Sequence, residues 1–96
     1  MEKILVVEDD IHISEMLCQL LRQNDYEPVA AYSGTEALLT LSQHEFSLIL
    51  LDLMLPGKTG EEVLKKLRVD SAVPVIVLTA RTDKKNNSGF TAFGSR

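Results

Sequence analysis

Short apolar runs alternate along the chain with segments in which apolar residues recur every three or four positions. The runs cover residues 3–7, 27–31, 46–51 and 73–78, and polar residues bound them. Short runs rich in Val, Ile and Leu are typical of strands buried on both faces of a parallel sheet. Because these runs alternate with segments of helical spacing, the sequence predicts an α/β fold with right-handed crossovers.

Capping signals mark where the three predicted helices begin. Asp10 is placed to cap the first helix, which Asn24-Asp25 ends. Ser33 and Thr59 are each followed three residues later by Glu, which is the spacing of a capping box. The apolar side chains of these helices are expected to face the core: Ile13, Met16, Leu17, Leu20, Leu21, Ala37, Leu38, Leu41, Val63, Leu64 and Leu67.

Composition restricts the class of protein. With 96 residues, 45% apolar and 25% charged, the chain is typical of one soluble domain. The net charge of −4 argues against nucleic-acid binding, and no apolar segment has the length of a signal peptide or a membrane span. Cys18 is the single cysteine and is expected to be a buried structural thiol, while His12 and His44 are expected at the surface. The predicted location is the cytoplasm.

Acidic residues stand where two of the predicted strands end. Glu8 and Asp9 follow the first strand, and Asp52 follows the third. The carboxyl ends of neighbouring parallel strands meet at the crevice where ligands bind, so these three side chains are expected to share one pocket. Negative charges so close together favour a bound cation, and Mg²⁺ prefers a few carboxylates together with water. The sequence therefore predicts a magnesium site.

Three sequence blocks resemble those of the receiver domain of bacterial two-component response regulators. They are Ile4–Asp10, Leu51–Gly57 and Val75–Ala80, in this order and at predicted strand ends. The second block is most similar to the subgroup in which a receiver precedes a winged-helix DNA-binding domain. The resemblance covers residues 1–80 and implies a flavodoxin-like, doubly wound parallel sheet with strand order 2-1-3-4.

The resemblance also implies a role for each site residue. Asp52 would accept a phosphoryl group from a histidine kinase or a phosphotransfer protein. Asp9, Asp52 and the backbone carbonyl of Met54 would hold Mg²⁺, with Glu8 acting directly or through water. Thr79 would bond a phosphoryl oxygen. The chain is thus expected to be a phosphoacceptor signalling module and not an independent enzyme.

The sequence departs from the family after Thr79. A complete receiver continues with a helix, a fifth strand that ends in a lysine beside the phosphorylation site, and a last helix, and none of these is recognisable here. We therefore expect an incomplete sheet, with residues 1–80 as a truncated receiver and residues 81–96 as a divergent, partly irregular tail. The missing lysine is expected to impair transfer, because the pocket loses a positive charge.

The departure leaves alternatives open. An uncovered fourth strand favours self-association through that strand or through residues 90–93, whereas residues 89–93 could instead fold back as a substitute edge strand. The chain could also be a non-signalling fragment that dimerises or only binds the kinase. A phosphatase of the haloacid dehalogenase type is disfavoured, because Met54 stands where a second Asp is needed.

Overall fold

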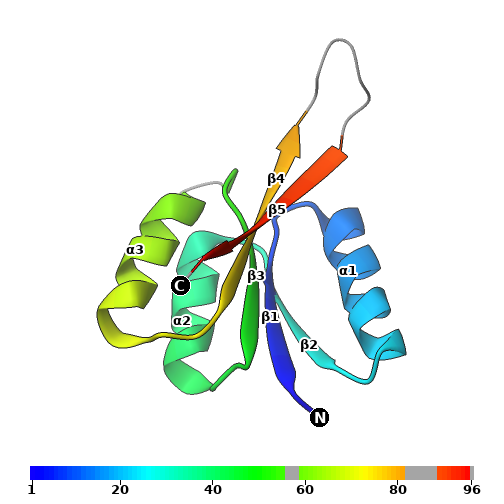
Figure 1. Ribbon diagram of the computed structural model, residues 1–96, viewed down its shortest axis with the longest axis horizontal. Helices are drawn as coiled ribbons and strands as arrows, with labels where there is room; N and C mark the ends of the chain where they lie inside the picture. The colour runs from blue at the N-terminus through cyan, green and yellow to red at the C-terminus, as the bar shows by residue number, and fades with distance from the viewer. Residues whose placement is uncertain (56–58, 82–88, 96) are drawn as a thin grey trace.

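The computed structural model describes residues 1–55, 59–81 and 89–95, so the predicted turn at Pro56-Gly57 lies outside the described residues. In the described part, one sheet contains β1 (Lys3–Val7), β2 (Glu27–Ala31), β3 (Leu48–Asp52), β4 (Val75–Arg81) and β5 (Gly89–Ser95) (Figure 1). The strand order is β2-β1-β3-β4-β5. The first four strands are parallel, and β5 is antiparallel to β4.

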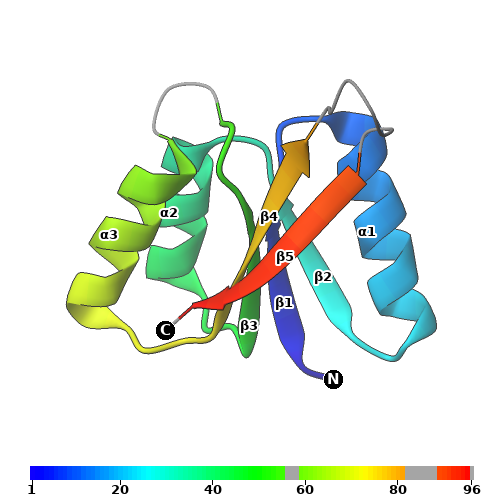
Figure 2. The ribbon, with the colours of Figure 1, turned by 45° about the horizontal axis from the view of Figure 1, so that its top comes forward.

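Three described helices cover the two faces of this sheet. They are α1 (Ile11–Gln23), α2 (Gly34–Gln43) and α3 (Gly60–Asp70). Figures 1 and 2 show α1 on one side of the sheet, with α2 and α3 next to each other on the opposite side. The predicted α/β class and the order 2-1-3-4 of the parallel strands are confirmed. No helix in the described ranges is long and apolar enough to cross a membrane.

The main hydrophobic core lies between the sheet and the pair α2 and α3. Every second residue of the central strands faces this side, and burying each such side chain contributes about 1.5–3 kcal/mol. Because β1, β3 and β4 all contribute to this layer, it fixes the central strands relative to one another. Its strand residues are Leu5, Val7, Ala31, Ile49, Leu51, Val75 and Val77, which pack with Ala37, Val63 and Leu67 of the helices.

The predicted caps hold the loops that lead into the helices. Asp10 caps α1, and its carboxylate accepts the Ile13 N–H at 3.0 Å. Thr59 forms a complete capping box at the start of α3. At α2 only half of the predicted box is present, because Glu36 accepts the N–H of Tyr32 at 2.7 Å and not that of the cap residue Ser33. The caps of α1 and α3 therefore fix the residues directly before each of these helices.

Two strands are shifted relative to the prediction. Strand β3 begins at Leu48, where its pairing with Ile4 of β1 begins, and ends on Asp52 itself, because Asp52 still pairs with Leu78 of β4. Strand β4 begins after Pro74, which has no N–H to donate to the sheet, although its carbonyl accepts the Ile49 N–H at 3.0 Å. As a result, Asp52 belongs to the sheet and is not a turn residue.

The buried side of α1 differs from the predicted apolar stripe. Ser14 and Cys18 are its buried residues, whereas Met16 and Leu20 are 48% and 51% exposed. Of the described helices, α1 is alone on its side of the sheet, so its outer apolar side chains have no helix to pack against (Figure 2). Cys18 is buried, as predicted.

Strand β5 covers the edge of β4 that the sequence predicted to be uncovered. The pairing runs from Val75 opposite Ser95 to Arg81 opposite Gly89. Because β4 pairs with β3 on one side and with β5 on the other, the predicted contact through an exposed fourth strand is wrong. The alternative, in which residues 89–93 fold back as a substitute edge strand, is confirmed, and the strand continues to Ser95.

Candidate metal centre

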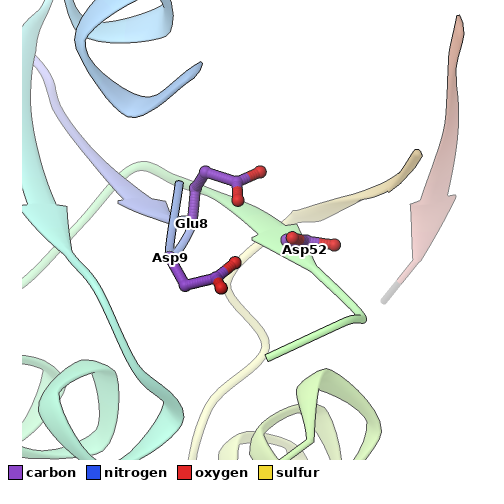
Figure 3. A group of neighbouring side chains, drawn as sticks. All are labelled: Glu8, Asp9 and Asp52. Atoms are coloured by element: carbon purple, nitrogen blue, oxygen red, sulfur yellow. The ribbon is translucent and has the colours of Figure 1, made fainter. Parts of the chain in front are cut away.

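Carboxylates from two adjacent strands meet at the carboxyl edge of the sheet. Glu8 and Asp9 directly follow β1, and Asp52 is the last residue of β3. The strands are parallel neighbours with Val7 opposite Leu51, so the residues that come next lie side by side. One oxygen of each carboxylate lies within 4.8 Å of the others (Figure 3). The structure thus brings together the three acids that the sequence predicted to share a pocket.

The two acids nearest the sheet are buried and oriented by backbone groups. Glu8 is 3% exposed and Asp52 is 6% exposed, whereas Asp9 is exposed. The N–H of Asp10 donates to Glu8 Oε2 at 3.0 Å, and the N–H of Met54 donates to Asp52 Oδ1 at 3.0 Å. Each donor lies two residues after its acceptor, so the chain that leaves each strand holds the carboxylate in place.

Burial raises the pKa of Glu8 from 4.5 to about 7. The Asp10 N–H lowers this pKa in part, but the nearby charge of Asp52 and hydrogen bonds with Asp52 and Asp9 raise it. Among the described residues, none of the influences on this pKa comes from a positively charged side chain. A cluster of this kind holds its negative charge poorly unless a cation is bound.

The donor set fits a small divalent ion. All three side chains offer oxygen, which Mg²⁺ and Ca²⁺ prefer over nitrogen or sulfur. In an octahedral Mg²⁺ site with bonds of about 2.0–2.1 Å, adjacent ligand oxygens are about 2.8–3.0 Å apart and opposite ones about 4.0–4.2 Å apart. Oxygens that already lie within 4.8 Å of one another need only small side-chain rotations to reach that geometry. Glu8, Asp9 and Asp52 are therefore the residues that could hold the ion.

Two further predicted site residues lie close to this cluster in the chain or in the sheet. Leu78 of β4 is opposite Asp52, and Thr79 is the next residue, so the backbone of Thr79 lies at the same edge of the sheet. Met54 donates its N–H to Asp52 and has an exposed side chain. The roles of the Thr79 hydroxyl and the Met54 carbonyl stay predictions.

Gly60, which directly follows the predicted cap residue Thr59, is a further residue that shapes this region. Its N–H donates to the Leu53 carbonyl at 3.2 Å. A Cβ at this position would overlap the Asp52 carbonyl oxygen and lie 2.5 Å from Leu53 Cα. The start of α3 therefore packs directly on the backbone that carries Asp52, and only glycine permits this approach. The only hint of this contact in the sequence is the glycine directly after the cap residue Thr59.

Comparison with known proteins gives a consistent family. The model of the response regulator receiver domain matches residues 4–94. The DNA-binding response regulator MtrA of Mycobacterium tuberculosis is 45% identical over 82 residues, which cover 85% of this chain and 36% of that protein. The sensory transduction protein RegX3 of Mycolicibacterium smegmatis is 42% identical over 81 residues, which cover 84% of this chain and 36% of that protein. The chain thus spans 36% of the length of these curated relatives.

Solved structures agree in fold. The receiver domain of the Francisella response regulator 1452 has a TM-score of 0.81 and 31% identity, and the match covers 90% of this chain and 72% of that one. The response regulator TrrA of Thermotoga maritima, solved in complex with Mg(2+)-BeF, has a TM-score of 0.81 and 36% identity. That match covers 85% of this chain and 72% of the other.

The raised pKa of Glu8 predicts a pH-dependent stability of the metal-free protein. The folded protein binds the Glu8 proton more tightly than the unfolded chain does, since the pKa of Glu8 is about 7 in the folded protein and 4.5 for an unperturbed glutamate. The contribution of Glu8 to the free energy of unfolding is fully present below about pH 4.5 and is lost as the pH rises through about 7. Over this range the free energy of unfolding should decrease by up to about 3 kcal/mol. Urea unfolding in a chelating buffer measures it. Glu8→Gln should flatten the profile between pH 5 and 8, and an unchanged profile in this variant would contradict the assignment.

The close approach of Gly60 predicts a large effect of a single methyl group. Gly60→Ala should lower the free energy of unfolding by about 2–4 kcal/mol, because the new Cβ forces α3 away from the backbone after Asp52. The control is Glu61→Ala, an exposed residue in the same helical turn, which should change stability by less than about 1 kcal/mol. Thermal unfolding followed by circular dichroism distinguishes the two. Equal effects of both substitutions would argue against the contact.

Proposed function

Since the chain belongs to the response regulator receiver domain family, we propose that Asp52 is its phosphoacceptor in a cytoplasmic two-component phosphorelay. The observation that carries this proposal is the carboxylate of Asp52, which is buried at a strand end beside Glu8 and Asp9. A phosphoacceptor domain of this kind is a signalling partner and not an enzyme acting on a substrate of its own.

The proposed reaction is phosphoryl transfer from a phosphohistidine to Asp52. The N–H of Met54 holds Oδ1 of Asp52, which leaves Oδ2 as the attacking oxygen. A bond forms between Oδ2 and phosphorus, the phosphorus–nitrogen bond of the donor breaks, and its imidazole keeps the electron pair. Burial of Asp52 limits the access of water to the resulting acyl phosphate, which favours a persistent signal.

Asp9, Asp52 and the carbonyl of Met54 are proposed to hold Mg²⁺, with Glu8 in contact directly or through water. When bound, the ion neutralises the charge of the phosphoryl oxygens. Glu8 contributes a second effect, because its raised pKa allows it to take up a proton near neutral pH when no cation is present. Protons should therefore compete with the metal at this position.

Thr79 is proposed to donate a hydrogen bond from its hydroxyl to the phosphoryl group. The support is its place in the sheet, one residue beyond the β4 residue that lies opposite Asp52. A hydroxyl donor at this edge would bond the transferred group after the reaction but not before it, so Thr79 would distinguish the two states of the protein.

The phosphoryl donor is proposed to be a histidine kinase or a phosphotransfer protein. DNA binding is part of the name of relatives such as MtrA and is a property of those proteins. The net charge of −4 supports our proposal that this chain itself binds no nucleic acid. Residues 1–80 would carry the site, and residues 81–96 would supply the edge strand. Since Gly89–Ser95 contains no lysine, transfer is expected to be slower than in a receiver with a lysine beside the acceptor.

A small phosphodonor tests the acceptor role directly. Incubation with acetyl phosphate and Mg²⁺ should add one phosphoryl group to the intact protein, because Asp52 needs only an activated donor. Mass spectrometry should detect the adduct, and alkaline hydroxylamine should remove it, as expected for an acyl phosphate. Asp9→Asn should reduce the rate of phosphorylation by at least about tenfold, because weaker metal binding should raise the activation free energy by about 1.4 kcal/mol or more.

The matched variants are Asp52→Asn and Asp10→Asn. Asp10 is a nearby carboxylate whose side chain caps α1, so its replacement should leave labelling intact. Asp52→Asn should abolish labelling. Adduct formation in Asp52→Asn, or its absence from the unsubstituted chain at saturating donor, would contradict the proposed function and favour the non-signalling fragment.

Self-association is a second proposal, and an apolar surface supports it. Leu50 and Leu78 are only partly buried on the side of the sheet that α1 shares. Leu17 and Leu20 of α1 line a shallow hollow of about 360 Å³ together with Leu50. Since no other described helix lies on this side, we propose that a second copy of the chain covers it.

Light scattering at increasing protein concentration tests this dimer. The unsubstituted chain should show a mass that rises toward that of two copies, and Leu20→Lys should shift the equilibrium toward the monomer by placing a charge in the contact. Leu39→Lys is the control, because Leu39 is an exposed apolar residue of α2 on the opposite side of the sheet. A monomer at every concentration would remove the proposal while leaving the acceptor role untouched.

A further inference from the structure

The described sheet has two edge strands, and β2 is the one that is protected against pairing with a further strand. The N–H of Glu27 donates to the Glu2 carbonyl at 2.9 Å, so the backbone groups of Glu27 face β1. Successive residues of a strand point their N–H and C=O groups to alternate sides, so those of Pro28 and Ala30 face away from β1. Because Pro28 has no N–H, the outer edge of β2 is a poor template for another strand.

The other edge strand, β5, has none of the features that usually prevent pairing. It contains seven residues, whereas β2 contains five. Its sequence, Gly89–Ser95, includes neither a proline nor a charged residue. Proline, charge and short length are the common protections of edge strands. In Figure 2, β5 is drawn in front of the other strands, and no described helix crosses it. Within the described part of the chain, its outer edge is therefore free to pair.

Hydrogen bonds between β3 and β4 determine which residues of β5 point outward. The N–H of Leu53 donates to the Leu78 carbonyl at 3.3 Å. The N–H of Ile49 donates to the Pro74 carbonyl at 3.0 Å. The even-numbered residues of β4 thus face β3, and the odd-numbered ones face β5, where each is opposite an odd-numbered residue. The outward backbone groups of β5 therefore belong to its even-numbered residues: Phe90, Ala92 and Gly94.

We propose that β5 of a second copy of the chain pairs antiparallel with this edge. The two Ala92 residues lie opposite each other, and Phe90 of each copy lies opposite Gly94 of the other. Each of these pairs exchanges two backbone hydrogen bonds, so the contact contains about six. The result is one continuous sheet that extends through both copies.

The symmetry of the strand favours a second copy over an unrelated peptide. Ala92 is the middle residue of Gly89–Ser95, and the other outward residues, Phe90 and Gly94, lie two positions on either side of it. A two-fold axis through the Ala92 pair therefore places every outward residue opposite another one, over the whole length of both strands. The edge is self-complementary, which is the requirement for a contact between identical chains.

This contact is expected to be weak and is separate from the proposed contact on the α1 side of the sheet. One pair of strands buries little surface, and each copy carries a net charge of −4. We therefore expect a dissociation constant of about 0.1–1 mM. Two different two-fold contacts would join copies into open chains, so the edge is best tested with Leu20→Lys, which weakens the other contact.

NMR of a mixture of isotope-labelled and unlabelled Leu20→Lys chains, at about 2 mM in total, tests the pairing. Thr91 of one copy should show an NOE between its Hα and the Hα of Phe93 in the other copy. In the proposed register these residues form a non-hydrogen-bonded pair, whose Cα atoms are about 4.5 Å apart. Hydrogen exchange of the Ala92 N–H should slow as the concentration rises, whereas the Phe93 N–H, which faces β4, should be protected at every concentration.

Ala92→Pro separates the edge contact from the fold of the chain. The substitution removes an N–H that points outward and leaves the hydrogen bonds to β4 in place, as proline permits on an edge strand. It should abolish the NOE between copies and weaken association at least about tenfold. Ala92→Ser retains the N–H and is the matched control, which should associate as before. An NOE between the Hα atoms of Leu78 and residue 92 checks that β5 still pairs with β4.

Two results would overturn the inference. One is the absence of an NOE between copies at about 2 mM, well above the expected dissociation constant. The other is an NOE between Thr91 and Phe93 of different copies that persists in Ala92→Pro. Neither result bears on the phosphoacceptor role of Asp52, which the labelling experiment tests separately.

Discussion

The parallel register between β1 and β3 is the constraint on which the acidic site depends. It places Glu8 and Asp52 beside each other where the two strands end, and the pKa of Glu8 is raised first by its burial and further by the nearby charge of Asp52. The hydrophobic layer beneath the strands, which includes Val7 and Leu51, fixes this register, since a slip of one residue would turn every core side chain to the other face. Packing energy thus holds together charges that would separate in a flexible chain.

The residues that directly follow β1 and β3 orient the carboxylates that the strand register brings together. The N–H groups of Asp10 and Met54 each bond a carboxylate two residues earlier, so the buried acids are fixed by their own chain. Gly60 brings the start of α3 onto the backbone that follows Asp52. The orientation of the acids is therefore a local property of two short segments, and it does not require the residues after β4.

Much of this architecture could be predicted from the sequence, because strand-length apolar runs alternate with capped helical segments. The grouping of the three acids followed from strand ends alone. The contact of Gly60 could not be predicted, since it depends on the angle at which α3 meets β3. The buried face of α1 was predicted only in part for a related reason. The apolar stripe of the helix is wider than the sheet surface it meets, so Met16 and Leu20 are exposed while Ser14, outside the stripe, is buried. Antiparallel pairing by the tail was only an alternative, because Gly89–Ser95 has weak strand signals.

The reversed direction of β5 determines where the polypeptide ends lie. Ser95 is opposite Val75, at the start of β4, and Lys3 begins β1 at the same amino-terminal border of the sheet. Lys3 and Ser95 thus lie toward the border of the sheet opposite to the one where β3 ends in Asp52. A strand of five residues is about 16 Å long. A fluorophore, a purification handle or a surface tether attached at either end would therefore stay about that far from the carboxylates, and would leave their approach unobstructed.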